Sequence, residues 1–139
     1  MGTMDKFLLA IKTYEGYYPP SFSNLWRGSV SYRNRNPINL RYSYLQAGTR
    51  GGFAYFDTYE QGYKAAKHQF TIIANGSSPA YNALGKAKYG VNNCKDLTLL
   101  QTMSIFSPSN DGNHPLTYAL YLAKQLNWNL DTKISKLLA

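Results

Sequence analysis

Apolar residues recur at helical spacing near the start of the chain, over residues 5–14. The side chains on the inner face of this pattern are Leu8, Leu9 and Ile11. Gly16 marks the end of the pattern, and the proline pair at 19–20 prevents continuation because proline lacks the N–H that a helix needs. The segment predicts a short amphipathic helix that ends immediately before Glu15.

The pattern changes between residues 29 and 56, where positions alternate with a period of two. The alternating segments read GSVSYR, INLRYSYL and GGFAYF. Three glycines, at positions 48, 51 and 52, supply the backbone freedom that tight turns require. We therefore expect a small antiparallel sheet of two or three strands, inserted after the first helix.

Helical spacing returns after this region. Asp57, followed three positions later by Glu60, is a capping-box pattern that predicts a helix from there to about residue 74. The residues expected on its buried face are Tyr63, Ala66, Phe70 and Ile73. The pair Asn75-Gly76 is typical of a helix end.

Further helix starts are predicted at four short polar or proline-linked signals. These signals are Ser78-Pro79, Asp96, His114-Pro115 and Asp131. We expect the helices to reach about residue 88, residue 106, residue 126 and the C-terminus, respectively. The fold class predicted from the whole pattern is α+β, mainly helical, in a single domain over residues 1–139.

Composition narrows the class of protein. Hydrophobic residues make up 44% of the 139, enough for one core, and no apolar run approaches the roughly 18 residues of a membrane span. The first residues lack the basic leader and longer apolar run of a signal peptide. One cysteine, Cys94, excludes an intramolecular disulfide, and His68 and His114 lack metal-ligand spacing, so we expect no metal and no cofactor.

The net charge of +8 favours polyanionic surroundings: nucleic acid, anionic lipid or a bacterial envelope. The basic residues are scattered, without a cluster of four or more. Tyrosine is the commonest aromatic residue, with 13 copies, and its polar tip suits contacts to sugars as well as to bases. Charge and aromatic content together do not separate a glycan binder from a nucleic-acid binder.

Glu15 is the first candidate for chemistry. It follows Ile11 by four residues and Leu8 by seven, so it continues the apolar side of its helix. It also lies at the C-terminal end, where the helix dipole is negative. Both effects disfavour the ionised form and raise a carboxyl pKa, which suits a general acid. The alternative is a surface glutamate paired with Lys12.

A glycosidase with two catalytic carboxylates needs a second acid that faces the first. The chain has no carboxylate between Glu15 and Asp57. Either Asp57 supplies the second group at the end of the third strand, or the site works with one acid. The remaining acids have capping signals as the simpler explanation.

Residues 33–43 combine amide and guanidinium donors with tyrosines, a mixture that suits N-acetylated sugars. The substrate-binding candidates there are Asn34, Asn36, Asn39, Arg41 and Tyr42. The alternative is a polar hairpin whose asparagines only form Asx turns. Tyr55 in the third strand and Tyr118 in a late helix are further candidates, with ordinary packing as the alternative for Tyr118. Two tryptophans, Trp26 and Trp128, either line a sugar groove or pack in the core.

The order of several short phrases resembles that in phage-borne cell-wall-degrading enzymes of the lysozyme superfamily. These phrases read YEGYY, RNRNPINLRY, GGFAYFDTYEQGYKAA and SIFSPSNDGNHPLTYALYLAKQL, and the likeness spans residue 10 to about residue 126. The resemblance implies a lysozyme-like fold. It also implies cleavage of the β-1,4 bond between N-acetylmuramic acid and N-acetylglucosamine, with Glu15 as general acid and base.

The chain departs from the family pattern at several positions. Arg35 and Ile38 replace Asn and Gly in the hairpin phrase, and residues 111–113 replace a Glu-Asn pair in the late phrase. Asn24 stands where a phage-type Glu-x8-Asp spacing would need an aspartate. The single-acid layout is more similar to goose-type lysozymes and lytic transglycosylases, in which either water or the 6-hydroxyl of the sugar completes the reaction.

Three functions follow as hypotheses. The first is a bacteriolytic hydrolase or transglycosylase of peptidoglycan, acting as a monomer from a phage virion or from the host cytoplasm, with other virion proteins as partners. The second is a catalytically inert peptidoglycan-binding virion protein on the same fold. The third, a basic nucleic-acid binder, is disfavoured because the chain has no basic stripe or recognised motif.

Overall fold

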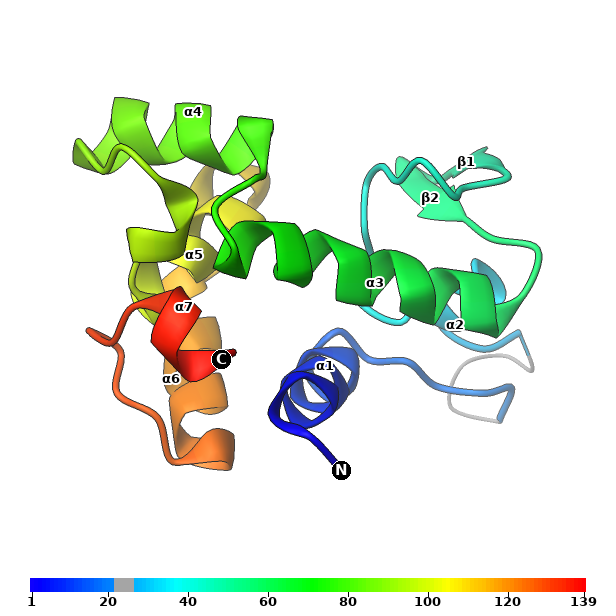
Figure 1. Ribbon diagram of the computed structural model, residues 1–139. Coiled ribbons are helices and arrows are strands. Elements are labelled where there is room, and N and C mark those ends of the chain that lie inside the picture. Colours follow the sequence, from blue (N-terminus) through cyan, green and yellow to red (C-terminus); the bar gives the residue numbers. More distant parts are fainter. Residues whose placement is uncertain (22–26) are drawn as a thin grey trace. The chain divides into compact units, whose positions relative to one another are not determined.

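The computed structural model describes residues 1–21 and 27–139. The chain separates into two compact units (Figure 1). The sheet unit is Leu8–His68, and the helical unit combines Met1–Phe7 with Gln69–Ala139. The helices α1 (Thr3–Tyr14) and α3 (Tyr59–Ala74) each contribute residues to both units.

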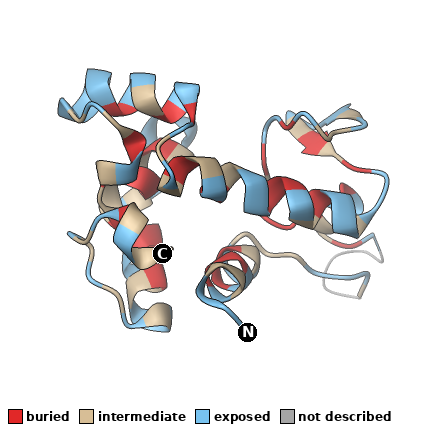
Figure 2. Ribbon diagram, in the orientation of Figure 1, coloured by how far each residue is buried: buried red, intermediate tan, exposed pale blue. Residues whose placement is uncertain are grey.

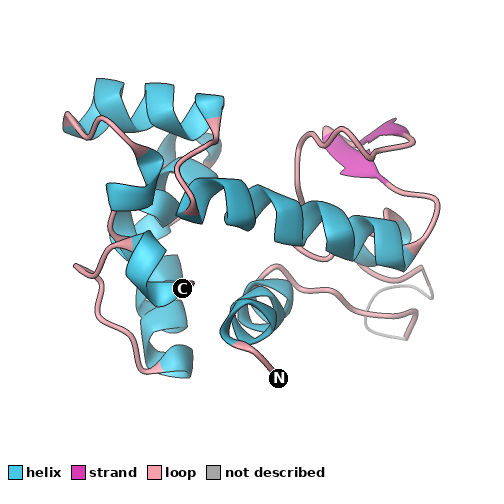
Figure 3. Ribbon diagram, viewed as in Figure 1, coloured by secondary structure: helices cyan, strands magenta, loops and turns pink. Residues whose placement is uncertain are grey.

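The sheet unit contains one β-hairpin, drawn in magenta in Figure 3. Strands β1 (Gly48–Arg50) and β2 (Phe53–Tyr55) pair antiparallel, with Thr49 opposite Ala54. The two-residue turn is formed by Gly51 and Gly52, with φ of 60° and 81°. Both angles are in the left-handed region, which glycine enters without steric cost and which a two-residue hairpin turn of this kind requires. The predicted turn is confirmed for Gly51 and Gly52, whereas Gly48, also predicted as a turn residue, begins strand β1.

The first predicted strand is wrong: its residues form the single helical turn α2 (Val30–Arg33). Ser29 is the N-cap of this turn, and its hydroxyl accepts a hydrogen bond from the backbone N–H of Tyr32 at 3.3 Å. A serine cap satisfies a backbone donor locally, and this contact prevails over the weak alternation of small residues.

The second predicted strand is also wrong, because residues 38–45 contain no strand. Asn39 has a φ of 54°, which bends the chain out of an extended conformation. The segment still lies alongside β2, since the Ala54 N–H donates to the Leu40 carbonyl at 2.9 Å. The sheet within the described residues thus has two strands, at the low end of the prediction.

The long helix α3 begins and ends where the sequence predicts, but a different residue caps it. Thr58 Oγ1 accepts a hydrogen bond from the Gln61 N–H at 3.1 Å, whereas Asp57, the predicted cap, is exposed. On the predicted inner face, Ala66, Phe70 and Ile73 are fully buried and Tyr63 is half-buried. The capping residue lies one position later than the pattern suggests.

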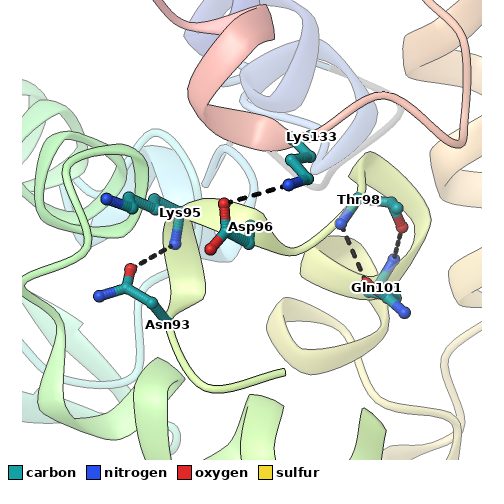
Figure 4. Close-up of polar contacts among 6 residues, drawn as sticks. All are labelled: Asn93, Lys95, Asp96, Thr98, Gln101 and Lys133. Carbon is teal, nitrogen blue, oxygen red and sulfur yellow. Dashed lines mark hydrogen bonds and ion pairs between the residues drawn. The ribbon is translucent and has the colours of Figure 1, made fainter. Parts of the chain in front are cut away.

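In the helical unit, α4 (Pro79–Tyr89) and α6 (Pro115–Leu126) begin at the predicted prolines. The helix α5 (Leu99–Phe106) is capped by Thr98, which forms a reciprocal capping box with Gln101 (Figure 4). Asp96, the residue predicted to cap α5, ends the short 3-10 turn η2 (Cys94–Asp96) and pairs with Lys133 at 3.4 Å.

The 3-10 turn η3 (Ser109–Asp111) precedes α6, and the helix α7 (Ile134–Leu137) is the last element of the helical unit. Lys133, not the predicted Asp131, occupies the N-cap position of α7. The core of the unit is drawn in red in Figure 2. Its fully buried side chains include Phe70, Leu99, Met103, Leu122 and Ile134.

Two properties of the whole chain follow from these elements. Over residues 1–21 and 27–139 the architecture is helix-rich with one small antiparallel hairpin, as the sequence predicts, and this hairpin follows α1 and α2. Each helix in the described ranges is too short or too polar to cross a lipid bilayer.

Candidate functional site

The backbone turn after α1 fixes the position of Glu15. The Glu15 N–H donates to the Ile11 carbonyl at 2.8 Å, so this residue is the last in the helical ladder. Gly16 follows with a φ of 75°, and the Tyr17 N–H returns to the Lys12 carbonyl at 3.3 Å. This is a Schellman ending, in which the residue before the glycine is the C-cap of the helix. Glu15 therefore lies at the negative end of the α1 dipole, as predicted.

The Glu15 side chain is half-buried and meets an amide from the hairpin phrase. Asn39 Nδ2 donates to Glu15 Oε1 at 3.3 Å. Asn39 occupies the left-handed region, which asparagine tolerates better than most residues, and its Oδ1 is buried without a hydrogen-bond partner in the structure. Two residues predicted separately for the site, one as acid and one as substrate contact, are thus brought together.

Asn36 is not a substrate contact, because its side chain is fully buried and used internally. Its Nδ2 donates to the carbonyls of Leu40 at 2.8 Å and Ala54 at 3.0 Å, and its Oδ1 accepts from the Leu40 N–H at 2.9 Å. The amide replaces the strand pairing that is missing over this segment and holds the loop against β2. Asn36 thus has a structural role, as in the alternative interpretation, but through longer-range bonds than those of an Asx turn.

Asn34 is buried as well, with 3% of its surface exposed. Its backbone carbonyl accepts from the Phe56 N–H at 2.9 Å, which joins the end of α2 to the end of the hairpin. Its Nδ2 is buried and has no hydrogen-bond partner among the residues that the structure describes. The prediction that Asn34 contacts substrate is wrong, since a sugar at the surface does not reach a side chain at this depth.

The other predicted contacts of the sheet unit remain at the surface. Arg41 is exposed, donates to the Gly52 carbonyl at 3.3 Å and lies over the Phe53 ring at 4.5 Å, so it supports the hairpin turn. Tyr42 is 74% exposed, and Tyr55 is half-buried on β2. These side chains are accessible to a ligand.

The aromatic candidates of the helical unit pack inside it. Tyr118 is 1% exposed, and its ring meets Phe106 edge-on, so the prediction that it faces a cleft is wrong. Trp128 stacks on Phe7 with ring centroids 5.5 Å apart, in accordance with the packing alternative. Trp26 lies outside the described residues.

A pocket that the sequence analysis did not anticipate opens in the sheet unit, with a volume of about 470 Å³. Its lining residues are Tyr17, Tyr32, Arg33, Arg35, Arg50 and Tyr59. Two chain segments connect it to the predicted acid. Tyr17 follows Glu15 by two residues, and Arg35 precedes Asn39 by four. The alternating Arg and Asn residues at 33–36 are a partial signal for this pocket. The sequence analysis assigns the asparagines to ligand binding, whereas the arginines line the pocket.

The tyrosines of the pocket form an edge-to-face cluster. The Tyr17 ring lies 5.4 Å from that of Tyr32 and 5.5 Å from that of Tyr59. Lys12 Nζ lies 4.6 Å from the Tyr17 ring and 4.7 Å from the Tyr59 ring, and it donates to Tyr59 Oη at 3.0 Å. Burial, followed by the neighbouring Tyr59 and Tyr32, raises the pKa of Tyr17, while Arg35 opposes the shift. The Tyr17 hydroxyl is therefore a proton donor at neutral pH.

No set of three His, Cys, Asp or Glu side chains placed to hold a metal ion occurs among residues 1–21 and 27–139. Comparisons of the chain with protein-family models, with curated proteins and with solved structures find no match.

Proposed function

We propose that the protein is a peptidoglycan glycosidase that cleaves the β-1,4 bond between N-acetylmuramic acid and N-acetylglucosamine, with Glu15 as general acid and base. The observation that carries the proposal is the position of the Glu15 carboxyl. It is half-buried at the C-cap of α1, it is held by the Asn39 amide, and it lies two residues from a tyrosine that lines an open pocket. The resemblance to phage-borne wall-degrading enzymes supplies the substrate and a lysozyme-like fold.

The dipole of α1 supports a proton-donating role, whereas the Asn39 N–H bond stabilises the carboxylate that is left once the proton has been donated. The last carbonyls of α1 place partial negative charge near Glu15, which disfavours its ionised form. The Asn39 amide can serve either protonation state of its neighbour, because its N–H₂ donates to a carboxylate and its carbonyl accepts from a carboxylic acid.

The proposed reaction needs one carboxyl group in two roles. Glu15 gives its proton to the glycosidic oxygen as the bond to the anomeric carbon breaks, and positive charge develops on the sugar ring. A hydroxyl group, from water or from the 6-position of the same sugar, then adds to the anomeric carbon. Its proton passes to the Glu15 carboxylate, which restores the acid for the next cycle.

The layout of the sheet unit favours the single-acid version of this chemistry. Asp57, the other carboxylate considered for the site, is exposed immediately after β2. An amide group, from Asn39, donates a hydrogen bond to Glu15. Amides position a sugar N-acetyl group or an attacking hydroxyl and do not act as nucleophiles. We therefore assign no catalytic step to Asp57.

The decisive variant is Glu15→Gln, which keeps the size of the side chain and its ability to accept a hydrogen bond but removes the acidic proton. Asp131→Asn is the matched control, because it makes the same chemical change at an exposed position of the helical unit. We expect Glu15→Gln to abolish clearing of cell-wall suspensions and Asp131→Asn to retain it. Clearing by Glu15→Gln at more than a small fraction of the wild-type rate would refute the assignment.

Mass spectrometry of the digest identifies the reaction. Fragments with reducing ends indicate attack by water, and 1,6-anhydro ends indicate attack by the sugar itself. Wall binding by the wild-type protein without release of any fragment would support the alternative of an inert wall-binding virion protein. A wall-degrading role fits a step in which a phage enters or leaves its host, with peptidoglycan as the substrate.

A further inference from the structure

The pocket in the sheet unit carries an excess of positive charge. Three of its six lining residues are arginines, and all three are exposed. Arg33, Arg35 and Arg50 form no ion pair within the described part of the chain. The carboxylate of Glu60 is close enough to influence Tyr17, but one acid does not balance three guanidinium groups. The pocket therefore presents charged donors that an anionic ligand group can satisfy.

Guanidinium groups are planar donors that bind oxyanions through paired N–H bonds. The tyrosines add hydroxyl donors from the same walls. Tyr17 packs edge-to-face with Tyr32 and Tyr59, and Lys12 covers one ring face of Tyr17 and one of Tyr59. A nucleic-acid base would need an open aromatic face for stacking. The arrangement favours an oxygen-rich anion over a stacked base.

The backbone around Arg35 is held in place by a close contact with α3. Gly62 of α3 lies so near the Arg35 carbonyl that a Cβ atom at Gly62 would be 1.9 Å from that oxygen. Arg35 itself has a φ of 50°, in the left-handed region. This contact keeps the α2 end of the pocket against the start of α3, which contributes Tyr59. The contact therefore fixes two of the backbone segments that line the pocket.

We infer that this pocket binds a carboxylate of the peptide substituents that peptidoglycan carries on its muramic acid residues. The inference rests on the proposed function, because it takes the wall glycan as the ligand. A volume of about 470 Å³ is far larger than a single anion and accommodates a short peptide segment. Tyr17 is two residues from Glu15 along the chain, and Arg35 is four residues from Asn39. The proposal therefore places the glycan strand of a pocket-bound peptide near the acid. The enzyme then selects peptide-bearing glycan over bare glycan.

Binding is measured in a Glu15→Gln background, so that the ligand is not consumed. The two probes are soluble glycan strands with intact peptides and the same strands after an amidase has removed the peptides. The pocket variant carries Arg33→Gln, Arg35→Gln and Arg50→Gln. The control variant loses three exposed positive charges in the helical unit through Lys86→Gln, Lys88→Gln and Lys124→Gln. Circular dichroism verifies that both are folded, and a second pocket variant without the Arg35 change keeps the test valid if the triple variant does not fold.

We expect peptide-bearing strands to bind on the order of tenfold more tightly than stripped strands, a preference equivalent to one or two charge-assisted hydrogen bonds. The preference should disappear in the pocket variant and persist in the control. Equal binding of the two probes, an equal loss in both variants, or tighter binding of a single-stranded oligonucleotide would overturn the inference. Fragment release by the wild-type enzyme is measured separately, so a failure of the proposed function and a failure of the pocket assignment are distinguishable.

Discussion

Replacement of Gly62 by alanine tests the contact that builds the pocket. A Cβ at this position would be 1.9 Å from the Arg35 carbonyl oxygen and 3.0 Å from its carbon, whereas ordinary contact begins at 3.4 Å. The backbone near Arg35 would have to move by about 1.5 Å, and backbone yields less readily than the end of a side chain. Overpacking costs about 1–3 kcal/mol, with this contact at the upper end, and the better helix propensity of alanine offsets about 1 kcal/mol. We expect the free energy of unfolding to fall by about 2 kcal/mol.

Gly85→Ala is the matched control, since Gly85 is also buried within a helix, α4. Its added Cβ would meet Leu97 Cδ2 at 3.2 Å, a side-chain atom that can shift by a few tenths of an ångström. The control should be neutral or more stable than the wild type, by up to about 1 kcal/mol. Urea unfolding followed by circular dichroism gives both values from the shift in midpoint. A Gly62→Ala protein at least as stable as Gly85→Ala would refute the reasoning about the Arg35 contact.

Two further predictions follow from single side chains. Asn39→Asp places a second carboxylate next to Glu15 and disfavours its ionisation, so the alkaline limit of wall-clearing activity should move to higher pH; an unchanged pH profile would show that the two groups do not interact. Burial, with a smaller contribution from Cys94, raises the pKa of Tyr81 above its ordinary value of 10.0. The neutral phenol therefore stabilises the fold below pH 10, and this contribution is lost as the pH rises toward the folded-state value. Tyr81→Phe should show a shallower loss of stability above pH 10 than the wild type in urea unfolding, and parallel curves would contradict the assignment.

The sequence predicts a helix end or a turn correctly where one or two residues determine the local backbone conformation. Ser78 and Pro79 start α4, Gly51 and Gly52 form the hairpin turn, and Gly16 ends the first helix one residue after Glu15. Each is a preference of the backbone itself, so neighbouring elements do not change it.

Where two nearby residues could each take the same structural role, tertiary contacts determine which of them does so. Asp96 and Thr98 both offer a cap for α5, and Thr98 is selected where the backbone pairs with Lys133 in an isolated bridge. Asn36 has the same chemistry as Asn39, but only Asn36 is surrounded by backbone groups that occupy all its hydrogen bonds. No spacing in the sequence distinguishes these cases.

The candidate site was predictable only in part for the same reason. Glu15 is identified by its place on one helix, which is a local property. The residues that line the pocket come from four separate segments of the chain, at Tyr17, 32–35, Arg50 and Tyr59. Whether these segments lie close together depends on how the sheet unit folds. The close approach of Gly62 to Arg35 is a clear example, because it joins residues that have no pattern in common.

The turn that ends α1 also limits how this protein can be engineered. One residue added within the helix would rotate everything after it by about 100°, but Glu15 and Tyr17 would turn together, since a single glycine separates them. Glu15, the proposed acid, and Tyr17, which lines the pocket, would thus change position together. Redesign of ligand preference without loss of the acid must therefore be sought on the opposite walls, in α2, β1 and α3.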